Sequence, residues 1–360
     1  MAFKAIPVVA GKVAATLSDY PAYIKPSDMD GWEDLTLAEA ESIRFYSDEA
    51  KTTELAREVV SADEIHVKVP SLTTTTTIYA DYDGIRADYA TDATYGAEAV
   101  WGDYEAVYHK NDLTTSTIRD SSGNSFDGDK RTANGPSQTT GKVGSAQDYS
   151  GGNDYVELPG NPVQVGENSH GSAGAWFKHN TGTTAQCIYF ERPTNSNDRL
   201  YIYLQSGNVK LFLGTGTDRT LGSFTSGVWN KVRLTFNATN FVVYLNGTQL
   251  ATNTYSASLG GGSLPAVIGS LNTTTWYFNG DIDEVTLLHS QLSADWELTE
   301  YNNQNDVGEF WGTVTDAGGA TDPITKVKVS GTFVPIAPKV KIGGTFVEKT
   351  SKVKVGGTFV

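Results

Sequence analysis

Residues 199–247 read RLYIYLQSGNVKLFLGTGTDRTLGSFTSGVWNKVRLTFNATNFVVYLNG and contain four short runs of alternating, β-branched or aromatic residues. The runs end at Gly, Asn or Ser, and Asn246-Gly247 supplies the two positive-φ residues that a type I′ hairpin turn needs. The QSGN sequence at 205–208 predicts a second hairpin turn. Closely spaced short strands are typical of a β-sandwich or barrel, so this stretch predicts an all-β fold.

The same strand signals extend outward in both directions, for example at 64–70 (EIHVKVP) and 75–82 (TTTIYADY). A helical pattern is clear only at 293–301, where Ser293 is a suitable N-cap and Trp296 and Tyr301 are available for one face. Composition divides the chain into four parts. These are a β-rich N-terminal domain at 1–102, a longer β domain at 103–303, a linker at 304–322, and a segment of different composition at 323–360.

Charge is distributed unevenly along the chain. Seven lysines and one acid in 323–360 give that segment a formal charge of +6, so the segment 1–322 carries −21 and the whole chain −15. A body of that sign repels phosphate backbones and argues against nucleic acid as a partner. No apolar run approaches the roughly 20 residues of a membrane span. The N-terminal sequence MAFKAIPVVAGKVAATLSDYP lacks the features of a secretory signal, and the single cysteine, Cys187, is expected to be buried in a strand.

The C-terminal segment is an internal repeat. KVKVSGTFV at 326–334, KVKIGGTFV at 339–347 and KVKVGGTFV at 352–360 follow one another at a constant spacing. Each unit is predicted to be a tight hairpin or a strand–kink–strand, with valines on one face and lysines on the other. A lone hairpin is marginal in water, so packing against a partner is expected. The lysine row can also be a solvated edge that blocks aggregation.

Several motifs occur in the order found in one known family. They include DSSGNSFDG at 120–128, GKVGSAQDYSGGNDY at 141–155 and FNGDIDEVTLL at 278–288. With these motifs the central region resembles the laminin-G-like, concanavalin-A-like jelly-roll family. The resemblance implies a jelly roll at 103–303.

The N-terminal region, through LSDYPAY at 17–23 and SIRFYSD at 42–48, resembles a β-rich domain of unknown function that often precedes such jelly rolls. The domain order, with the repeated C-terminus, is similar to that of phage tail or virion-surface proteins. By this analogy the protein is made in the host cytoplasm, lies on the virion surface and contacts other virion proteins through 323–360. Homo-oligomers, trimers among them, are expected by the same analogy.

Enzymatic activity is not expected. Glucanases of the concanavalin-like class carry Glu-x-Asp-x-x-Glu on one strand, because retaining hydrolysis needs two carboxyl groups about 5–5.5 Å apart. The nearest sequence here, DIDEV at 281–285, lacks the first and last Glu. Five histidines form no HExxH, HxH or Cys/His pair, and His109 and His289 are expected to be packed or at strand edges.

Two kinds of site remain candidates. By resemblance, one structural calcium is expected on Asp120, Asn124 and Asp283, although the first two can equally form Asx turns and Asp283 can pair locally. Sugar sites combine an exposed aromatic plane with polar donors and acceptors. Variable loops supply such residues, and we list Trp276, Tyr255, Asn195, Asn197, Asp198 and Arg199 as candidate ligand contacts.

Three functional hypotheses follow. The first is a non-enzymatic virion-associated adhesion or receptor-binding protein, such as a tail fibre, whose jelly roll contacts a host cell-surface glycan. The second is a purely structural capsid or tail decoration protein anchored by 323–360. The third is a polysaccharide hydrolase on a concanavalin-like fold.

Overall fold

The computed structural model of the chain describes residues 2–109, 112–114, 116–131, 135–163, 170–192, 199–214, 218–254 and 264–317, together with short strands after residue 324. Met1–Thr315 form one compact unit and Asp316–Val360 a second. Strands dominate, and the described pairs are antiparallel, as the sequence predicts for an all-β chain.

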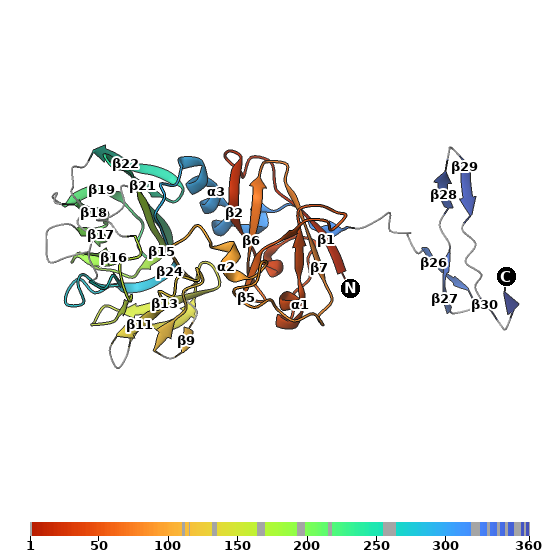
Figure 1. The fold of residues 1–360 in the computed structure, drawn as a ribbon, viewed down its shortest axis with the longest axis horizontal. Helices are drawn as coiled ribbons and strands as arrows, with labels where there is room; N and C mark the ends of the chain where they lie inside the picture. The colour runs from red at the N-terminus through yellow and green to blue at the C-terminus, as the bar shows by residue number, and fades with distance from the viewer. Residues whose placement is uncertain are drawn as a thin grey trace. The chain divides into compact units, whose positions relative to one another are not determined.

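The N-terminal domain consists of two sheets packed on one apolar core (Figure 1). The first sheet has the order β25 (Thr315–Asp316), β1 (Ala2–Pro7), β7 (Thr77–Tyr82), β3 (Arg44–Tyr46) and β4 (Glu54–Leu55). The second has the order β2 (Leu17–Ile24), β6 (Glu64–Leu72) and β5 (Arg57–Ser61). Three short helices complete the domain, η1 (Pro26–Asp28), α1 (Leu37–Ser42) and α2 (Ala97–Val100).

The chain returns to this core after the jelly roll. Helix α4 (Val307–Phe310) and the residues that follow it bury Phe310, Trp311 and Val314 in the N-terminal core. Trp311 donates its indole N–H to the carbonyl of Tyr23 at 2.9 Å. The linker expected at 304–322 is therefore wrong for its first part, since 307–314 complete the packing of the domain that begins the chain.

The jelly roll consists of two larger sheets. In the described residues one sheet has the order β19 (Arg219–Ser223), β18 (Asn208–Gly214), β17 (Arg199–Gln205), β16 (Gln186–Glu191), β23 (Val267–Ile268), β14 (Tyr155–Glu157), β11 (Gly128–Arg131), β10 (Thr117–Ile118) and β9 (Asp112–Thr114). The other has the order β12 (Ser137–Thr140), β13 (Ser145–Ser150), β24 (Asn279–Leu288), β15 (Gly171–His179), β20 (Trp229–Phe236), β21 (Asn240–Leu245) and β22 (Thr248–Thr254), with β8 (Ala106–Tyr108) beside β24.

Local sequence explains the hairpins of the jelly roll. Asn246 and Gly247 have φ values of 52° and 73° between β21 and β22, as a type I′ turn requires. Ser206 and Gly207, at 50° and 72°, form the second expected turn between β17 and β18. Alternate residues of the strands face the core between the sheets, and Cys187 is buried as expected.

Helix α3 (Ala294–Asn305) begins at the Ser293 cap, as expected, but it is longer than the sequence pattern predicts. Its most buried side chains are polar and include Glu297 and Glu300, while Trp296 packs against the neighbouring cores and Tyr301 stacks on Trp176. Glu297 and Glu300 contact Lys231 and Arg233 of β20, and we call these four residues the α3 cluster. All four are at most 5% exposed.

The contacts of the α3 cluster are short and reciprocal. Arg233 Nε lies 3.0 Å from Glu297 Oε1, and Arg233 Nη2 lies 2.9 Å from Glu300 Oε2. Lys231 Nζ contacts Glu300 and lies 3.4 Å from Glu297 Oε2. Burial alone would raise the pKa of Glu300, but the charges of Lys231 and Arg233 outweigh it and lower the pKa to about 2. Two cations and two carboxylates therefore dock the helix on the sheet.

The C-terminal repeats form three separate antiparallel hairpins, as the sequence predicts. They are β26 (Thr325–Val329) with β27 (Thr332–Ile336), β28 (Lys339–Ile342) with β29 (Thr345–Glu348), and β30 (Lys354–Val355) with β31 (Thr358–Phe359). Among the residues described, no helix is long and apolar enough to cross a membrane.

Candidate functional site

An aromatic platform lies on the outer face of the nine-stranded sheet. Along β17, Leu200, Ile202 and Leu204 enter the jelly-roll core, so Tyr201 and Tyr203 face the other way. Trp276 stacks on Tyr203, with ring centroids 4.9 Å apart and an angle of 29° between the planes. Phe212 of β18 stacks on Tyr201 at 4.8 Å. We call Tyr201, Tyr203, Phe212 and Trp276 the platform.

The loop that carries Trp276 has an unusual backbone. Asn272, Thr273 and Trp276 have φ values of 52°, 62° and 56°, in the left-handed region that residues other than glycine rarely occupy. The Trp276 carbonyl accepts a 2.8 Å hydrogen bond from the Cys187 N–H, which ties the loop to β16. Such conformations persist only where the surrounding structure enforces them, and they concentrate at binding sites. The fold thus holds Trp276 half-buried over a buried aromatic layer.

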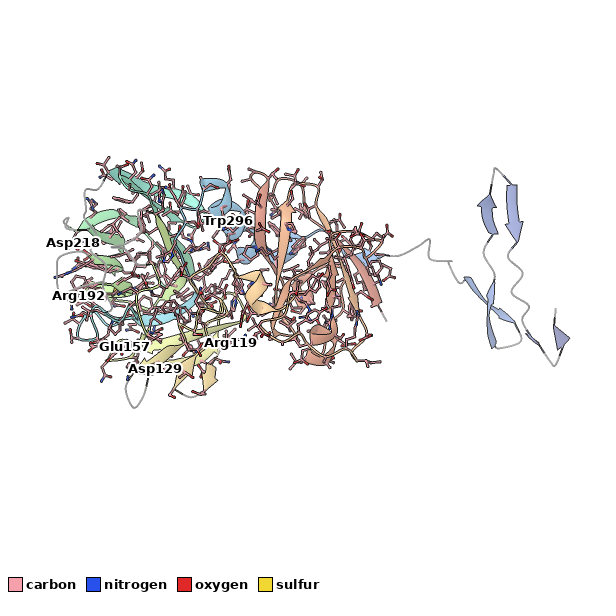
Figure 2. The ribbon with its side chains drawn as sticks, viewed as in Figure 1. Arg119, Asp129, Glu157, Arg192, Asp218 and Trp296 are labelled. Carbon is pink, nitrogen blue, oxygen red and sulfur yellow. The ribbon has the colours of Figure 1, made fainter. Side chains whose placement is uncertain are left out.

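Polar groups border the platform. The Tyr201 hydroxyl lies 3.1 Å from Asp218 Oδ1, and Arg192 Nη2 donates to Asn272 Oδ1 at 3.2 Å. Arg199 begins β17 on the same face as Tyr201 and Tyr203, because residues two apart in a strand share a face. In Figure 2, Arg192 and Asp218 lie at the edge of the jelly roll, far from Trp296. Aromatic planes beside guanidinium, amide and carboxylate groups can stack on and hydrogen-bond to a sugar.

The structure brings two of the predicted ligand contacts to one surface, Trp276 and Arg199. Tyr255, Asn195, Asn197 and Asp198 lie outside the described residues. Tyr201, Tyr203 and Phe212 were not among the predicted contacts. The signal for the two tyrosines is the alternation in RLYIYL at 199–204, where every second residue after Arg199 is a tyrosine facing away from the core.

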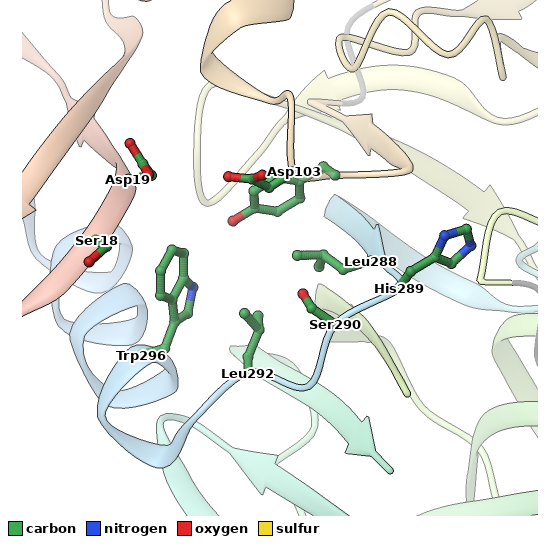
Figure 3. Close-up of a pocket in the computed structure, with 9 residues that line it drawn as sticks. Ser18, Asp19, Asp103, Leu288, His289, Ser290, Leu292 and Trp296 are labelled. Carbon is green, nitrogen blue, oxygen red and sulfur yellow. The ribbon is translucent and has the colours of Figure 1, made fainter. Parts of the chain in front are cut away.

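A groove of about 450 Å³ lies between the N-terminal domain and the jelly roll. Figure 3 shows Trp296 and Leu292 on one side of it, with Asp19 and Asp103 opposite. The Trp296 indole nitrogen is buried and makes no hydrogen bond to the part of the chain that the structure describes. Lys68 lies 3.9 Å from Asp19 Oδ1 and 3.8 Å from Asp103 Oδ2. Nothing in the sequence indicates this groove, which is a second candidate place for a small ligand.

The predicted calcium ligands make local hydrogen bonds. Asp120 is buried and accepts from the N–H groups of Val107, Ser122 and Phe126. The Asn124 side-chain amide donates to the carbonyls of Tyr104 and Glu105. These contacts agree with the alternative role of Asp120 and Asn124 as residues that form and stabilise the turn.

Asp283, the third predicted calcium ligand, accepts from the N–H groups of Lys142 and Val143 at 2.8 and 2.9 Å. Over the described ranges no hydrogen bond or ion pair joins Asp283 to Asp120 or Asn124. The calcium site stays a prediction.

The carboxylates of the closing strand do not present a hydrolytic pair. Asp283 is 0% and Glu284 3% exposed, so a polysaccharide chain does not reach them. Asp281 is half-buried and pairs with Lys178 at 3.1 Å. Retaining hydrolysis needs two carboxyl groups facing the same bound sugar. The geometry of β24 therefore gives the hydrolase hypothesis no support.

A family model agrees with the architecture of the central domain. Residues 150–296 match the family model described as the concanavalin A-like lectin/glucanases superfamily. The search of curated proteins found no match.

Among solved structures, the chain is similar to domain 4 of AbnA, an extracellular GH43 arabinanase from Geobacillus stearothermophilus, determined in complex with arabinotriose. The identity is 20% and the TM-score 0.45, covering 56% of this chain and 98% of that one.

It is also similar to the binding domain of botulinum neurotoxin serotype D, with 15% identity and a TM-score of 0.46, covering 58% of this chain and 53% of that one. The binding domain of Paraclostridial Mosquitocidal Protein 1 gives 13% identity and a TM-score of 0.43, over 55% and 52%. The chain thus spans about half the length of these two toxin domains. The family match and the two stacked sheets agree, and the central domain is a concanavalin A-like jelly roll.

Proposed function

We propose that this chain is a non-enzymatic adhesion protein whose jelly roll binds a glycan at the platform. The observation that carries the proposal is Trp276, held half-buried in a left-handed backbone conformation and stacked on Tyr203 at 4.9 Å. The apolar face of a pyranose stacks on such a ring, and the neighbouring Arg192, Arg199 and Asp218 supply donors and acceptors for its hydroxyls.

The C-terminal hairpins support an assembly role in the same proposal. Each repeat pairs only within itself in the described residues, and an isolated two-stranded hairpin is marginal in water. A basic segment of +6 in a chain whose remainder carries −21 favours contact with acidic surfaces. We place the protein on a virion surface, joined through 323–360 to other virion proteins or to further copies of itself, with a trimer as one such assembly.

Glycan binding is tested by screening the full chain on a glycan array and titrating the best ligand. Trp276→Ala should weaken binding at least about tenfold, which corresponds to about 1.4 kcal/mol. Trp229→Ala is the matched control, because Trp229 is a half-buried tryptophan on the other sheet. Loss of binding only in Trp296→Ala would move the ligand to the groove and overturn the platform assignment. Absence of binding to any glycan or host cell would contradict the adhesion role.

The assembly role is tested separately with a chain that ends at residue 322, beyond the compact unit at 1–315. The shortened chain should stay folded but be missing from purified particles, as measured by mass spectrometry of the particles. Its incorporation at the normal level would show that 323–360 is not the anchor. Normal adsorption of particles that lack the whole protein would favour the decoration hypothesis.

A further inference from the structure

A cluster of acids and histidines is buried where the N-terminal domain meets the jelly roll. We call it the junction cluster, and it consists of Glu58, Glu64, His66, His109 and Glu284. All five are at most 4% exposed. Glu58 lies on β5, Glu64 and His66 on β6, His109 directly after β8, and Glu284 on β24. Both domains therefore supply side chains to one site.

A β-bulge directs Glu284 to this site. The pairing of β24 with β15 shifts register opposite Gly174 and Trp176, and Glu284 has a φ of 46°. Ile282 and Val285 both enter the jelly-roll core, so the two residues between them lie on the opposite face. A regular strand would place only one of them there. A left-handed backbone conformation is unfavourable for a glutamate. Such strain is found where the surrounding structure enforces a functional geometry.

Four donor atoms converge in the cluster. One atom each from Glu64, His66, His109 and Glu284 lies within 4.8 Å of all the others. His109 Nδ1 lies 3.5 Å from Glu64 Oε1, and His66 Nε2 lies 3.7 Å from the same oxygen. Zinc–ligand bonds of about 2.0–2.2 Å place tetrahedral ligands about 3.3–3.6 Å apart, so the first separation fits and the second lies slightly above this range. The 2.6 Å between His109 Nδ1 and Glu284 Oε1 would have to widen.

Several polar atoms of the cluster make no hydrogen bond to the rest of the described chain. They are both ring nitrogens of His66, Oε1 of Glu64 and Oε2 of Glu284. A buried polar atom without a partner is unfavourable by about 1–3 kcal/mol and calls for an explanation. Four such atoms in one cluster indicate that a further group is bound among them.

Glu58 fixes the orientation of the His109 ring. Its Oε2 lies 3.1 Å from His109 Nε2 and accepts a 2.6 Å hydrogen bond from the Trp101 indole, while Oε1 accepts from Ser121 at 2.7 Å. His109 Nδ1 and Glu284 Oε1 lie 2.6 Å apart, the separation of a hydrogen bond, so a proton lies between them when no metal is bound. A metal ion on Nδ1 would take the place of that proton, while Nε2 keeps its proton toward Glu58. Histidines that bind metals have such carboxylate partners on their other nitrogen.

The charges of the cluster also favour a bound cation. Over the described ranges no Lys or Arg forms an ion pair with Glu58, Glu64 or Glu284. One divalent ion would offset two of these buried carboxylates and accept the lone pair of one ring nitrogen of His66, which makes no hydrogen bond to the described chain.

We propose that Glu64, His66, His109 and Glu284 bind one Zn²⁺-class divalent transition-metal ion that joins the N-terminal domain to the jelly roll. Two imidazoles and two carboxylates are a donor set that suits such an ion. Four protein ligands leave no open position, which is typical of a structural site and not of a catalytic one. The ion acts as a clamp, because each domain supplies two of its ligands.

The test uses the full chain without an added histidine tag, stripped with a chelator and then titrated with Zn²⁺ or Co²⁺. We expect one ion per chain by elemental analysis, a visible absorption band with Co²⁺, and a higher melting temperature with Zn²⁺. A stripped wild-type chain that takes up no stoichiometric ion, and whose melting temperature does not respond, would overturn the proposal and leave a network balanced by protons.

Variants locate the ion. His66→Gln and Glu64→Gln should abolish stoichiometric binding and the Co²⁺ band, and Glu58→Gln should weaken affinity about 10–100-fold through the orientation of His109. His179→Gln is the matched control, since His179 is also buried but lies at the end of β15, outside the cluster. Circular dichroism checks that each variant folds. Equal loss of metal in the control and in the ligand variants, or normal binding in all of them, would contradict the assigned site.

Discussion

The two buried ionic clusters of this molecule differ in how well their negative charges are matched by positive ones. In the α3 cluster, two carboxylates meet Lys231 and Arg233. In the junction cluster, three carboxylates meet only two histidines, and over the described ranges no Lys or Arg forms an ion pair with them. Burying charge is favourable only with full compensation. The first cluster therefore needs nothing beyond the chain, whereas the second needs a cation from solution.

The largest expected effect comes from breaking the balanced cluster. Arg233→Met leaves Glu297 without its 3.0 Å partner and removes one of the two cations at Glu300. We expect the free energy of unfolding to fall by about 3–5 kcal/mol, measured by urea denaturation. Arg131→Met is the control, because Arg131 is 46% exposed beside Glu157, and it should change the free energy by less than about 1 kcal/mol. Equal losses of unfolding free energy in Arg233→Met and Arg131→Met would contradict the larger contribution expected of the buried arginine.

Acid should weaken the α3 cluster. The pKa of Glu300 in the folded chain is lowered to about 2 from an ordinary value of 4.5. A carboxyl with a lowered folded pKa stabilises the fold above its unfolded pKa and loses that contribution as the pH falls through the folded value. The contribution of Glu300, about 3 kcal/mol, is therefore complete above pH 5 and lost between about pH 4.5 and 2.

The measurement is the free energy of unfolding from pH 7 to pH 3, in the wild type and in Glu300→Gln. Because glutamine does not titrate, the difference between the two proteins should shrink toward acid. A difference that stays constant over this range would show that Glu300 is not the group responsible.

The same substitution at the two clusters sharpens the comparison. Glu300→Gln removes charge-assisted hydrogen bonds and should lower the free energy of unfolding by about 2–3 kcal/mol at neutral pH. Glu64→Gln, measured on chelator-stripped protein, removes a carboxylate that forms no ion pair with a Lys or Arg in the described structure, so its effect should be under about 1 kcal/mol or slightly stabilising. With Zn²⁺ added, Glu64→Gln should be clearly less stable than the wild type, because only the wild type then gains stability from the bound ion. Equal losses of unfolding free energy in Glu300→Gln and Glu64→Gln, both measured on stripped protein, would show that the two clusters do not differ in this way.

The smallest effect is expected just before the bulge in β24. Asp281 pairs with Lys178, which is 38% exposed, and such pairs contribute little. Burial raises the pKa of Asp148, and the neighbouring Asp281 raises it further. Asp281→Asn should change the free energy of unfolding by less than about 1 kcal/mol and lower the pKa of Asp148, measured by NMR titration. A larger loss would place Asp281 in a network that these contacts do not contain.

Local signals predicted much of the fold. Asn246-Gly247 and Ser206-Gly207 identify their hairpins because few other residues tolerate two consecutive positive φ values. Ser293 identifies the start of α3 through its side-chain cap. The return of 307–314 to the N-terminal core has no such signal, because burial of Phe310 and Trp311 depends on strands at the other end of the sequence.

The sites were predicted less completely. Trp276 stands out in a polar loop, but its support by Tyr203 depends on the pairing of strands. The acid and histidine of EIHVKVP share one face of a strand, a pattern visible at 64–66, yet their partners come from strands much later in the chain. The Glu284 bulge breaks the strand's alternation, and no local sequence rule marks that position.

The route of the chain also sets an order for its biosynthesis. The first domain lacks Phe310, Trp311 and Val314 until the whole jelly roll has left the ribosome, so its core closes last although its strands are translated first. Meanwhile the jelly roll can fold as an inserted module. Because the chain leaves and re-enters the same domain, the jelly roll is an insertion in it, and only a replacement that keeps His109 and Glu284 would preserve the shared junction.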